Sequence, residues 1–130
     1  MAFTTKTRYG AMKSYKDDRK ISSVVESLIE ELETEQFDKP DDEHTQVAIG
    51  NGDWAVTVTV YGLMILDDMR ELENDEVCEE LFIRAKSRNE AVAMLTLMAQ
   101  GKIEDVRAAG WVPREQLPPY KRALFRKSNR

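Results

Sequence analysis

The chain has 130 residues, a formal net charge of −5 at pH 7, 42% hydrophobic residues and 33% charged residues. This length suits one domain with its own core, and the composition excludes a disordered chain. No apolar run is long enough for a transmembrane helix, and the N-terminus lacks the apolar block of a signal peptide. A single cysteine, Cys78, excludes an internal disulfide, so these features together predict a cytoplasmic protein.

The charges fall into four alternating blocks. Residues 6–20 and 84–130 carry net charges of about +4 and +7, whereas residues 26–43 and 67–80 carry about −8 and −7. Such blocks can steer a charged partner towards one face of a protein. The alternative is that the acidic segments only solvate the surface, or pair with the basic segments within the fold.

The first predicted elements are a strand and a helix. Residues 7–16 predict a strand that Gly10 weakens, with its apolar side chains facing inward. Ser23 and Glu26 have the spacing of a capping box, in which each side chain satisfies a free backbone N–H of the first helical turn. Apolar residues at positions 21, 25, 28, 29 and 32 form one stripe, which predicts an amphipathic helix that ends near Gln36.

Residues 45–61 carry the strongest local signal. Polar and apolar residues alternate on both sides of the turn sequence Gly50-Asn51-Gly52-Asp53. An Asn-Gly pair tolerates the positive φ angles of a tight turn, so the pattern predicts a β-hairpin. A phosphate-binding loop is the weaker interpretation, because a strand and not a helix follows the glycines.

Two more strands and two helices complete the predicted elements. Residues 63–68 and 77–85 predict strands, the second with Leu81 and Ile83 facing inward. Ser87 and Glu90 form another capping box, and Gly101 is a natural end for the helix that follows. A short helix precedes Gly110.

The order of these elements predicts an α+β fold. We expect a single domain over residues 1–119, with an antiparallel sheet of about four to five strands and two main helices packed on one face. Residues 120–130 are predicted to form a basic C-terminal tail.

The chain offers few groups for catalysis or metal binding. His44 follows three acidic residues, but neighbouring loop residues rarely converge on one ion. Cys78 lies at an apolar strand position and is better explained as a core residue than as a nucleophile. Asp67, Asp68 and Glu71 could act in acid–base chemistry, although acids at a strand end are usually solvated. We therefore predict no enzymatic activity, no metal and no cofactor.

A binding protein is the remaining class, with an acidic face that meets a basic partner. Aromatic and basic residues alternate in the tail, which is a pattern for single-stranded nucleic acid, but the overall acidity argues against nucleic acid as the partner. No membrane partner is expected, and Cys78 with the exposed sheet edges is compatible with a homodimer. The predicted partner-binding residues are Glu30, Glu33, Asp41, Asp42, Asp67, Asp68 and Glu71, with Trp111 as a hydrophobic anchor in a proline-bounded loop.

The layout of residues 20–111 resembles small immunity proteins of bacterial polymorphic-toxin and contact-dependent inhibition systems. The segments that carry the likeness are a helix "VVESLIEEL", a hairpin "TQVAIGNGDWAVTV", a strand "GLMIL", and a helix that ends near "GKIEDVRAAGW". The resemblance implies a protein without enzymatic activity that binds and neutralises a cognate toxin domain. It implies no particular binding residues, because each member's surface is matched to its own toxin.

Two other hypotheses stay open at this point. The chain could be a phage or plasmid accessory protein that inhibits a host defence enzyme or sequesters its small-molecule signal, and a polar pocket with basic residues such as Arg8 or Arg84 would favour this. It could also be a small enzyme that uses Asp67, Asp68 and Glu71, and a recessed pocket around these acids would then be required.

Overall fold

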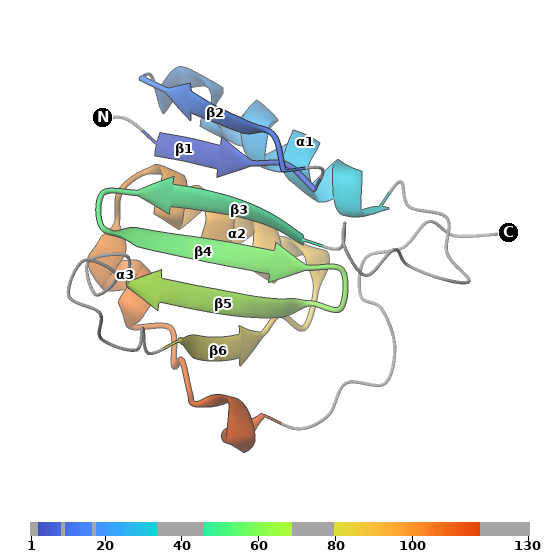
Figure 1. The fold of residues 1–130 in the computed structure, drawn as a ribbon, viewed down its shortest axis with the longest axis vertical. Helices are drawn as coiled ribbons and strands as arrows, with labels where there is room; N and C mark the ends of the chain where they lie inside the picture. Colours follow the sequence, from blue (N-terminus) through green and yellow to red (C-terminus); the bar gives the residue numbers. More distant parts are fainter. Residues whose placement is uncertain (1–2, 9, 17, 34–45, 69–79, 118–130) are drawn as a thin grey trace, which may run out of the picture.

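The computed structural model describes residues 3–8, 10–16, 18–33, 46–68 and 80–117. Within them, six strands form one sheet, and two main helices cover one of its faces (Figure 1). The strands are β1 (Phe3–Lys6), β2 (Met12–Tyr15), β3 (Gln46–Asn51), β4 (Trp54–Thr59), β5 (Leu63–Asp68) and β6 (Leu81–Arg84). The helices are α1 (Ile21–Glu33), α2 (Arg88–Ala99) and α3 (Ile103–Arg107), with 3₁₀ turns η1 (Asp18–Lys20) and η3 (Arg114–Gln116).

The predicted α+β class is confirmed, and the sheet has six strands where four to five were expected. Its strand order is β2-β1-β3-β4-β5-β6, and every neighbouring pair is antiparallel. β2 and β3 both run antiparallel to β1, so they point the same way and α1 carries the chain across β1 between them. The predicted domain boundary after residue 119 lies outside the described residues.

The extra strand comes from the N-terminus, where one strand over residues 7–16 was the wrong prediction. The chain instead forms the hairpin β1–β2, and Gly10 lies in its turn with a φ angle of +86°. Positive φ suits glycine because it has no Cβ to clash with the backbone. The residue that weakened the strand prediction therefore marks the turn between two short strands.

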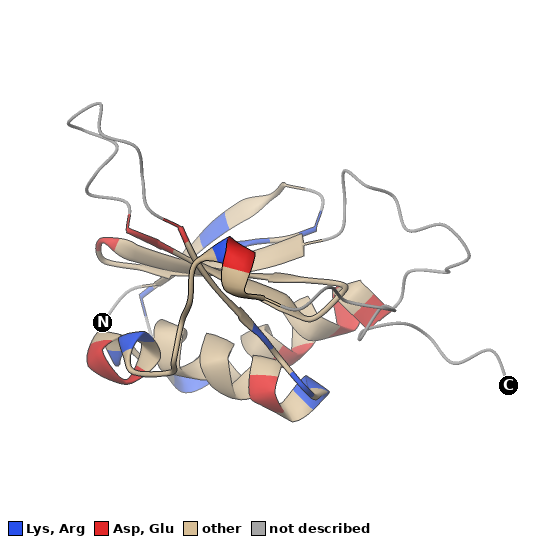
Figure 2. Ribbon diagram, turned by 90° about the horizontal axis from the view of Figure 1, so that it is seen from below, with Lys and Arg blue, Asp and Glu red and all other residues tan. Residues whose placement is uncertain are grey.

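The core lies between the helices and one face of the sheet (Figure 2). α1 contributes the whole predicted stripe, and α2 contributes Ala91, Met94, Leu95, Met98 and Ala99. The sheet contributes Phe3, Val47, Ile49, Val56, Val58, Met64 and Leu66. Burial of side chains of this size stabilises a fold by about 1.5–3 kcal/mol each, so this one interface holds the layers together.

The two predicted capping boxes have different outcomes. Ser87 accepts a hydrogen bond from Glu90 N at 3.3 Å, as predicted, and Gly101 closes α2 with a φ of +75°. At α1 the prediction is wrong, because the helix begins at Ile21 after η1 and Ser23 Oγ donates to Lys20 O at 3.2 Å. Glu26 therefore does not cap α1, and its carboxylate is available for another partner.

The face of the sheet opposite the helices, called the open face below, carries both polar and apolar side chains. One cross-strand row runs Met12, Lys6, Ala48, Thr57, Ile65 and Phe82, from β2 to β6. At the β6 end, Phe82 pairs with Val112 through two backbone hydrogen bonds, and the Arg114 guanidinium lies 5.6 Å from the Phe82 ring centroid. The segment after α3 thus covers Phe82, which is buried on this face.

In the part of the chain that the structure describes, no helix combines the length and apolar character needed to cross a bilayer.

Candidate functional site

Of the acidic residues predicted to form one surface, those that the structure describes lie on both sides of the sheet. Asp67 pairs with Ala55 and Asp68 with Trp54, and neighbouring residues of a strand point to opposite faces. Asp67 therefore belongs to the open face, whereas Asp68 shares the helix side with Trp54. Glu30 is exposed on α1, in the helix layer. The structure thus separates Asp67 from Glu30 by the thickness of the sheet.

Asp67 lies opposite a second carboxylate that the sequence did not single out. The register of β5 and β6 places Leu66 against Leu81, so the next position of each chain brings Asp67 to Glu80. The pKa of Asp67 is raised to about 6, mainly by burial, and also by the negative charge of Glu80 and a hydrogen bond between the two carboxyl groups. Asp67 and Glu80 are called the acidic pair below.

The acidic pair brings two carboxyl groups together on neighbouring strands of the sheet. Glu80 is exposed and Asp67 is half-buried. Like charges directly opposite each other destabilise a sheet, and a cation placed between them would remove this cost. The geometry therefore favours a Lys or Arg side chain from outside.

Glu33 has an intramolecular role. Arg88 Nε lies 3.0 Å from Glu33 Oε2, and Arg88 Nη2 lies 2.7 Å from Glu26 Oε2. The hydrogen bonds that Arg88 donates to Glu26, and then the one it donates to Glu33, raise the pKa of Arg88 above its usual range. The hydrogen bonds with Arg88 lower the pKa of Glu26. Two carboxylates of the acidic helix thus pair with one arginine of the second basic block within the fold, as the alternative explanation of the charge blocks expected.

Trp111 is half-buried and packs against the core. Its indole Nε1 donates to Val106 O at 2.6 Å, which ties the segment after α3 to that helix. Trp54 is half-buried too, and the Arg107 guanidinium lies 4.9 Å from its ring centroid. Trp111 was predicted to be a hydrophobic anchor for a partner, and in the structure both tryptophans make contacts within the fold.

Three predicted site residues, Asp41, Asp42 and Glu71, lie outside the described residues. So do His44, Cys78 and the basic tail over residues 120–130. Among the described residues, no group of three or more His, Cys, Asp or Glu side chains could hold a metal ion.

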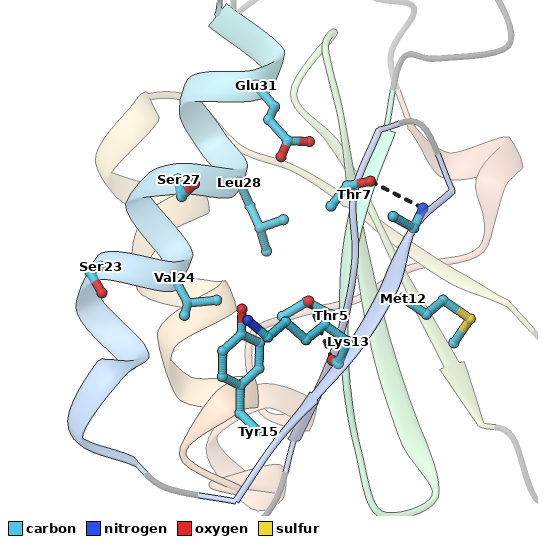
Figure 3. Close-up of a pocket in the computed structure, with 11 residues that line it drawn as sticks. Thr5, Thr7, Met12, Lys13, Tyr15, Ser23, Val24, Ser27, Leu28 and Glu31 are labelled. Atoms are coloured by element: carbon cyan, nitrogen blue, oxygen red, sulfur yellow. Dashed lines mark hydrogen bonds between the residues drawn. The ribbon is translucent and has the colours of Figure 1, made fainter.

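A groove of about 500 Å³ lies between the β1–β2 hairpin and α1 (Figure 3). Val24 and Leu28 point into it from α1, while Lys13 and Tyr15 point into it from β2. The other residues along it are Thr5, Thr7, Ala11, Met12, Ser23, Ser27 and Glu31. This space is called the β2–α1 groove.

The groove has an apolar floor and a polar rim. Val24 and Leu28 are buried, whereas Ser23, Ser27 and Lys13 are exposed. At one end, Glu31 Oε1 accepts from Arg8 N at 3.0 Å, and Arg8 Nη1 donates to Glu31 O at 3.1 Å. These bonds fasten the start of the hairpin turn to the last turns of α1, and they hold the two walls apart at a set distance.

No family model matches this chain, and neither the curated proteins nor the solved structures contain a significant match to it.

Sequence reasoning missed Glu80 and the groove for the same reason. Both depend on contacts between residues far apart in the chain, and local periodicity carries no information on such pairings. A usable signal exists for Glu80: strands that follow each other usually pair, and Asp67 and Glu80 lie close to the two ends of one connection between strands.

Proposed function

We propose that this chain is a non-catalytic binding protein that neutralises a cognate toxin domain through an acidic surface. The observation that carries the proposal is the acidic pair, in which two carboxylates face each other on adjacent strands. A protein whose fold alone mattered would gain stability by losing one of these charges. In a complex with a basic partner, a Lys or Arg of that partner would offset the repulsion between the two carboxylates, so both would contribute to binding.

The surroundings of the acidic pair suit a close protein contact. On the open face, the row that contains Asp67 runs through Thr4, Gly50 and Ala55, so its side chains are short. A partner can therefore approach the backbone of β3 and β4 and still reach Asp67. We take this face as the centre of the contact, with Asp68 at the same end of β5.

The proposed partner is basic, which fits a toxin that acts on nucleic acid. Such enzymes bind phosphates through Lys and Arg, and an acidic surface competes for the same groove. The order of elements over residues 20–111 resembles that of immunity proteins of bacterial polymorphic-toxin systems, and this resemblance points to the same partner. The proposal leaves Glu33 out of the contact surface, because that carboxylate already binds Arg88.

The rival proposal is an accessory protein that inhibits a host defence enzyme or sequesters a small-molecule signal. It called for a pocket with basic residues such as Arg8 or Arg84. Arg8 Nη1 donates to Glu31 O, and Arg84 Nη1 donates to Tyr61 O at 3.5 Å, so both side chains brace the backbone. Of the described residues along the β2–α1 groove, Lys13 is the one base, which makes this proposal the weaker of the two.

Co-purification with the product of the adjacent gene tests the proposal. The tagged chain is passed over an extract that contains this product, at about 50 mM and about 500 mM NaCl. We expect a stoichiometric complex at low salt that weakens at high salt, and loss of toxicity in cells that express both proteins. A complex that is absent at both salt concentrations, with toxicity unchanged, would reject the proposal.

A further inference from the structure

Strand β2 ends the sheet with open backbone groups. Thr7 N donates to Ala11 O at 2.9 Å, which sets the phase of the hydrogen bonds in the hairpin. In an antiparallel pair, every second residue bonds to its partner and the residues between turn their N–H and C=O outward. Thr5 and Lys13 therefore bond across the hairpin, and Met12 and Ser14 direct their backbone groups away from β1.

The opposite edge of the sheet is different. There, Phe82 N donates to Val112 O at 2.8 Å and Val112 N donates to Phe82 O at 2.9 Å, so the chain covers part of the edge strand β6 itself. Among the described residues, no segment lies outside β2 in the sheet order. Met12 is 70% exposed, and it is the one large hydrophobic side chain exposed among these residues.

The β2–α1 groove lies directly beside this open edge (Figure 3). An extended peptide that adds to β2 places every second side chain on the helix side, where Val24, Leu28 and Ser27 would receive it. Peptide recognition by strand addition needs this combination: main-chain hydrogen bonds give affinity, and a groove for alternate side chains gives specificity. A volume of about 500 Å³ lies within the range of ligand pockets.

We propose that β2 binds an extended acidic segment of a partner polypeptide as an additional strand, with alternate side chains of that segment in the β2–α1 groove. We infer the acidic character of this segment from the positive charge of the described surface around β2. Lys6, Lys13, Lys16 and Lys20 are exposed on the hairpin and at the start of α1. A strand that carries Asp or Glu beside its apolar residues would neutralise them.

The same lysines argue against a second copy of this chain as the occupant. Two β2 strands side by side would bring two sets of lysines together, and lysine on an edge strand is a common defence against such pairing. The lysines attract an acidic segment instead. This attraction acts at long range and weakens as the salt concentration rises. The open edge therefore selects a partner by charge.

This site is independent of the proposed toxin contact. Strands β1, β3 and β4 lie between β2 and β5, and the groove lies on the helix side of the sheet, whereas Asp67 lies on the open face. The two surfaces differ in charge as well. The peptide site would remain if the acidic pair proved to have no partner.

The test starts from a display library of twelve-residue peptides selected against the full chain. The enriched sequence is then made as a fluorescein-labelled peptide, and its affinity is measured by fluorescence anisotropy at about 50 mM and about 500 mM NaCl. We expect peptides in which acidic and apolar residues alternate, with affinity that falls as salt rises. Enrichment of no sequence above background, or of sequences without acids, would overturn the proposal.

Two matched pairs of variants locate the binding site. Ser14→Pro removes the outward N–H and leaves the hairpin bonds intact, so we expect a loss of about tenfold or more in affinity. Ser14→Ala keeps the N–H and should bind like the wild type. Ser27→Tyr fills the groove and should weaken binding about tenfold, while Ser22→Tyr, exposed on the same helix outside the groove, should not.

Circular dichroism and thermal unfolding check that each variant is folded. If Ser14→Pro does not fold, the comparison of Ser27→Tyr with Ser22→Tyr tests the proposal. Equal affinity for Ser27→Tyr and Ser22→Tyr would contradict the proposal. Light scattering provides the last control, because a dimer that Ser14→Pro or Ser27→Tyr dissociates would make a second copy the occupant and would reject the acidic partner.

Discussion

Glu26, in the second turn of α1, holds Arg88, the first residue of α2, through both terminal nitrogens of the guanidinium group. Nη2 lies 2.7 Å from Oε2 and Nη1 lies 3.3 Å from Oε1. A cation at the start of a helix opposes the helix dipole, so Arg88 alone would weaken α2. The carboxylates of α1 reverse this effect and join the two helices at their surface.

The first prediction concerns this ion pair. Glu26→Gln should lower the free energy of unfolding, because the substitution leaves Arg88 at the helix start without its main partner. The loss should be only about 1 kcal/mol, because the ion pair is partly exposed and screened by solvent. In an Arg88→Ala background the same change should cost much less. Urea unfolding of the two single variants and the double variant measures the coupling. Equal effects of Glu26→Gln in both backgrounds would show that the pair contributes nothing.

The second prediction concerns the pH dependence caused by Asp67. Its folded pKa, about 6, lies above the ordinary value of 3.8, so the folded state binds its proton more tightly than the unfolded state. The associated stabilisation is complete below the ordinary value and is lost as the pH rises through about 6. Asp67→Asn should therefore be more stable than the wild type at pH 7.5, by about 1 kcal/mol after allowance for solvent screening, and the difference should vanish towards pH 3.5.

Thermal unfolding at several pH values measures this difference, and Glu30→Gln, which removes a charge from an exposed helix position, is the control. A carboxyl NMR titration gives the pKa of Asp67 directly. A midpoint near the ordinary value, together with no gain in stability at pH 7.5, would contradict the account of the acidic pair.

The third prediction separates the two capping boxes. Ser87→Ala should destabilise the protein by about 1 kcal/mol, because Glu90 N loses its acceptor at the start of α2. Ser23→Ala should change the stability by less than about 0.5 kcal/mol, because Ser23 lies inside α1 and caps nothing. Denaturant unfolding of both variants compares them. A large effect at Ser23 would mean that α1 begins where the sequence motif placed it.

The fourth prediction concerns the indole of Trp111. Trp111→Phe keeps most of the apolar contact but removes the donor to Val106 O, and we expect a loss of about 1 kcal/mol. Trp111→Ala removes the packing as well and should cost about 3 kcal/mol or more. Thermal unfolding measures both. If Trp111→Ala leaves the stability unchanged and weakens partner binding alone, Trp111 is the surface anchor of the sequence-based hypothesis and has no structural role.

Local signals in the sequence predicted the elements that depend on local chemistry. Gly52 adopts a φ of +62° between β3 and β4, as its Asn-Gly pair indicated, and the apolar stripe of α1 is buried in full. The N-terminal hairpin was missed because its strands have four residues each, too few for alternation to distinguish two strands from one.

The candidate sites were less predictable because they depend on long-range pairing. Arg88 and Glu26 are 62 residues apart in the chain, and neither local sequence carries a pattern that predicts their contact. The sequence motif predicted that Glu26 caps α1, whereas in the structure its carboxylate binds Arg88. In the same way, counting acids placed Asp67 and Asp68 on one surface, whereas strand geometry turns them to opposite faces.

The affinity of the adjacent gene product for charge variants of this chain tests the central claim most directly. The double variant Asp67→Lys/Glu80→Lys keeps a like-charge pair in the sheet and reverses its sign, so its stability should stay close to that of the wild type. We predict that it binds the partner at least a hundredfold more weakly, with most of the salt dependence lost, while Glu30→Lys binds within about threefold of the wild type. Wild-type affinity in the double variant would show that the acidic pair is not the binding surface.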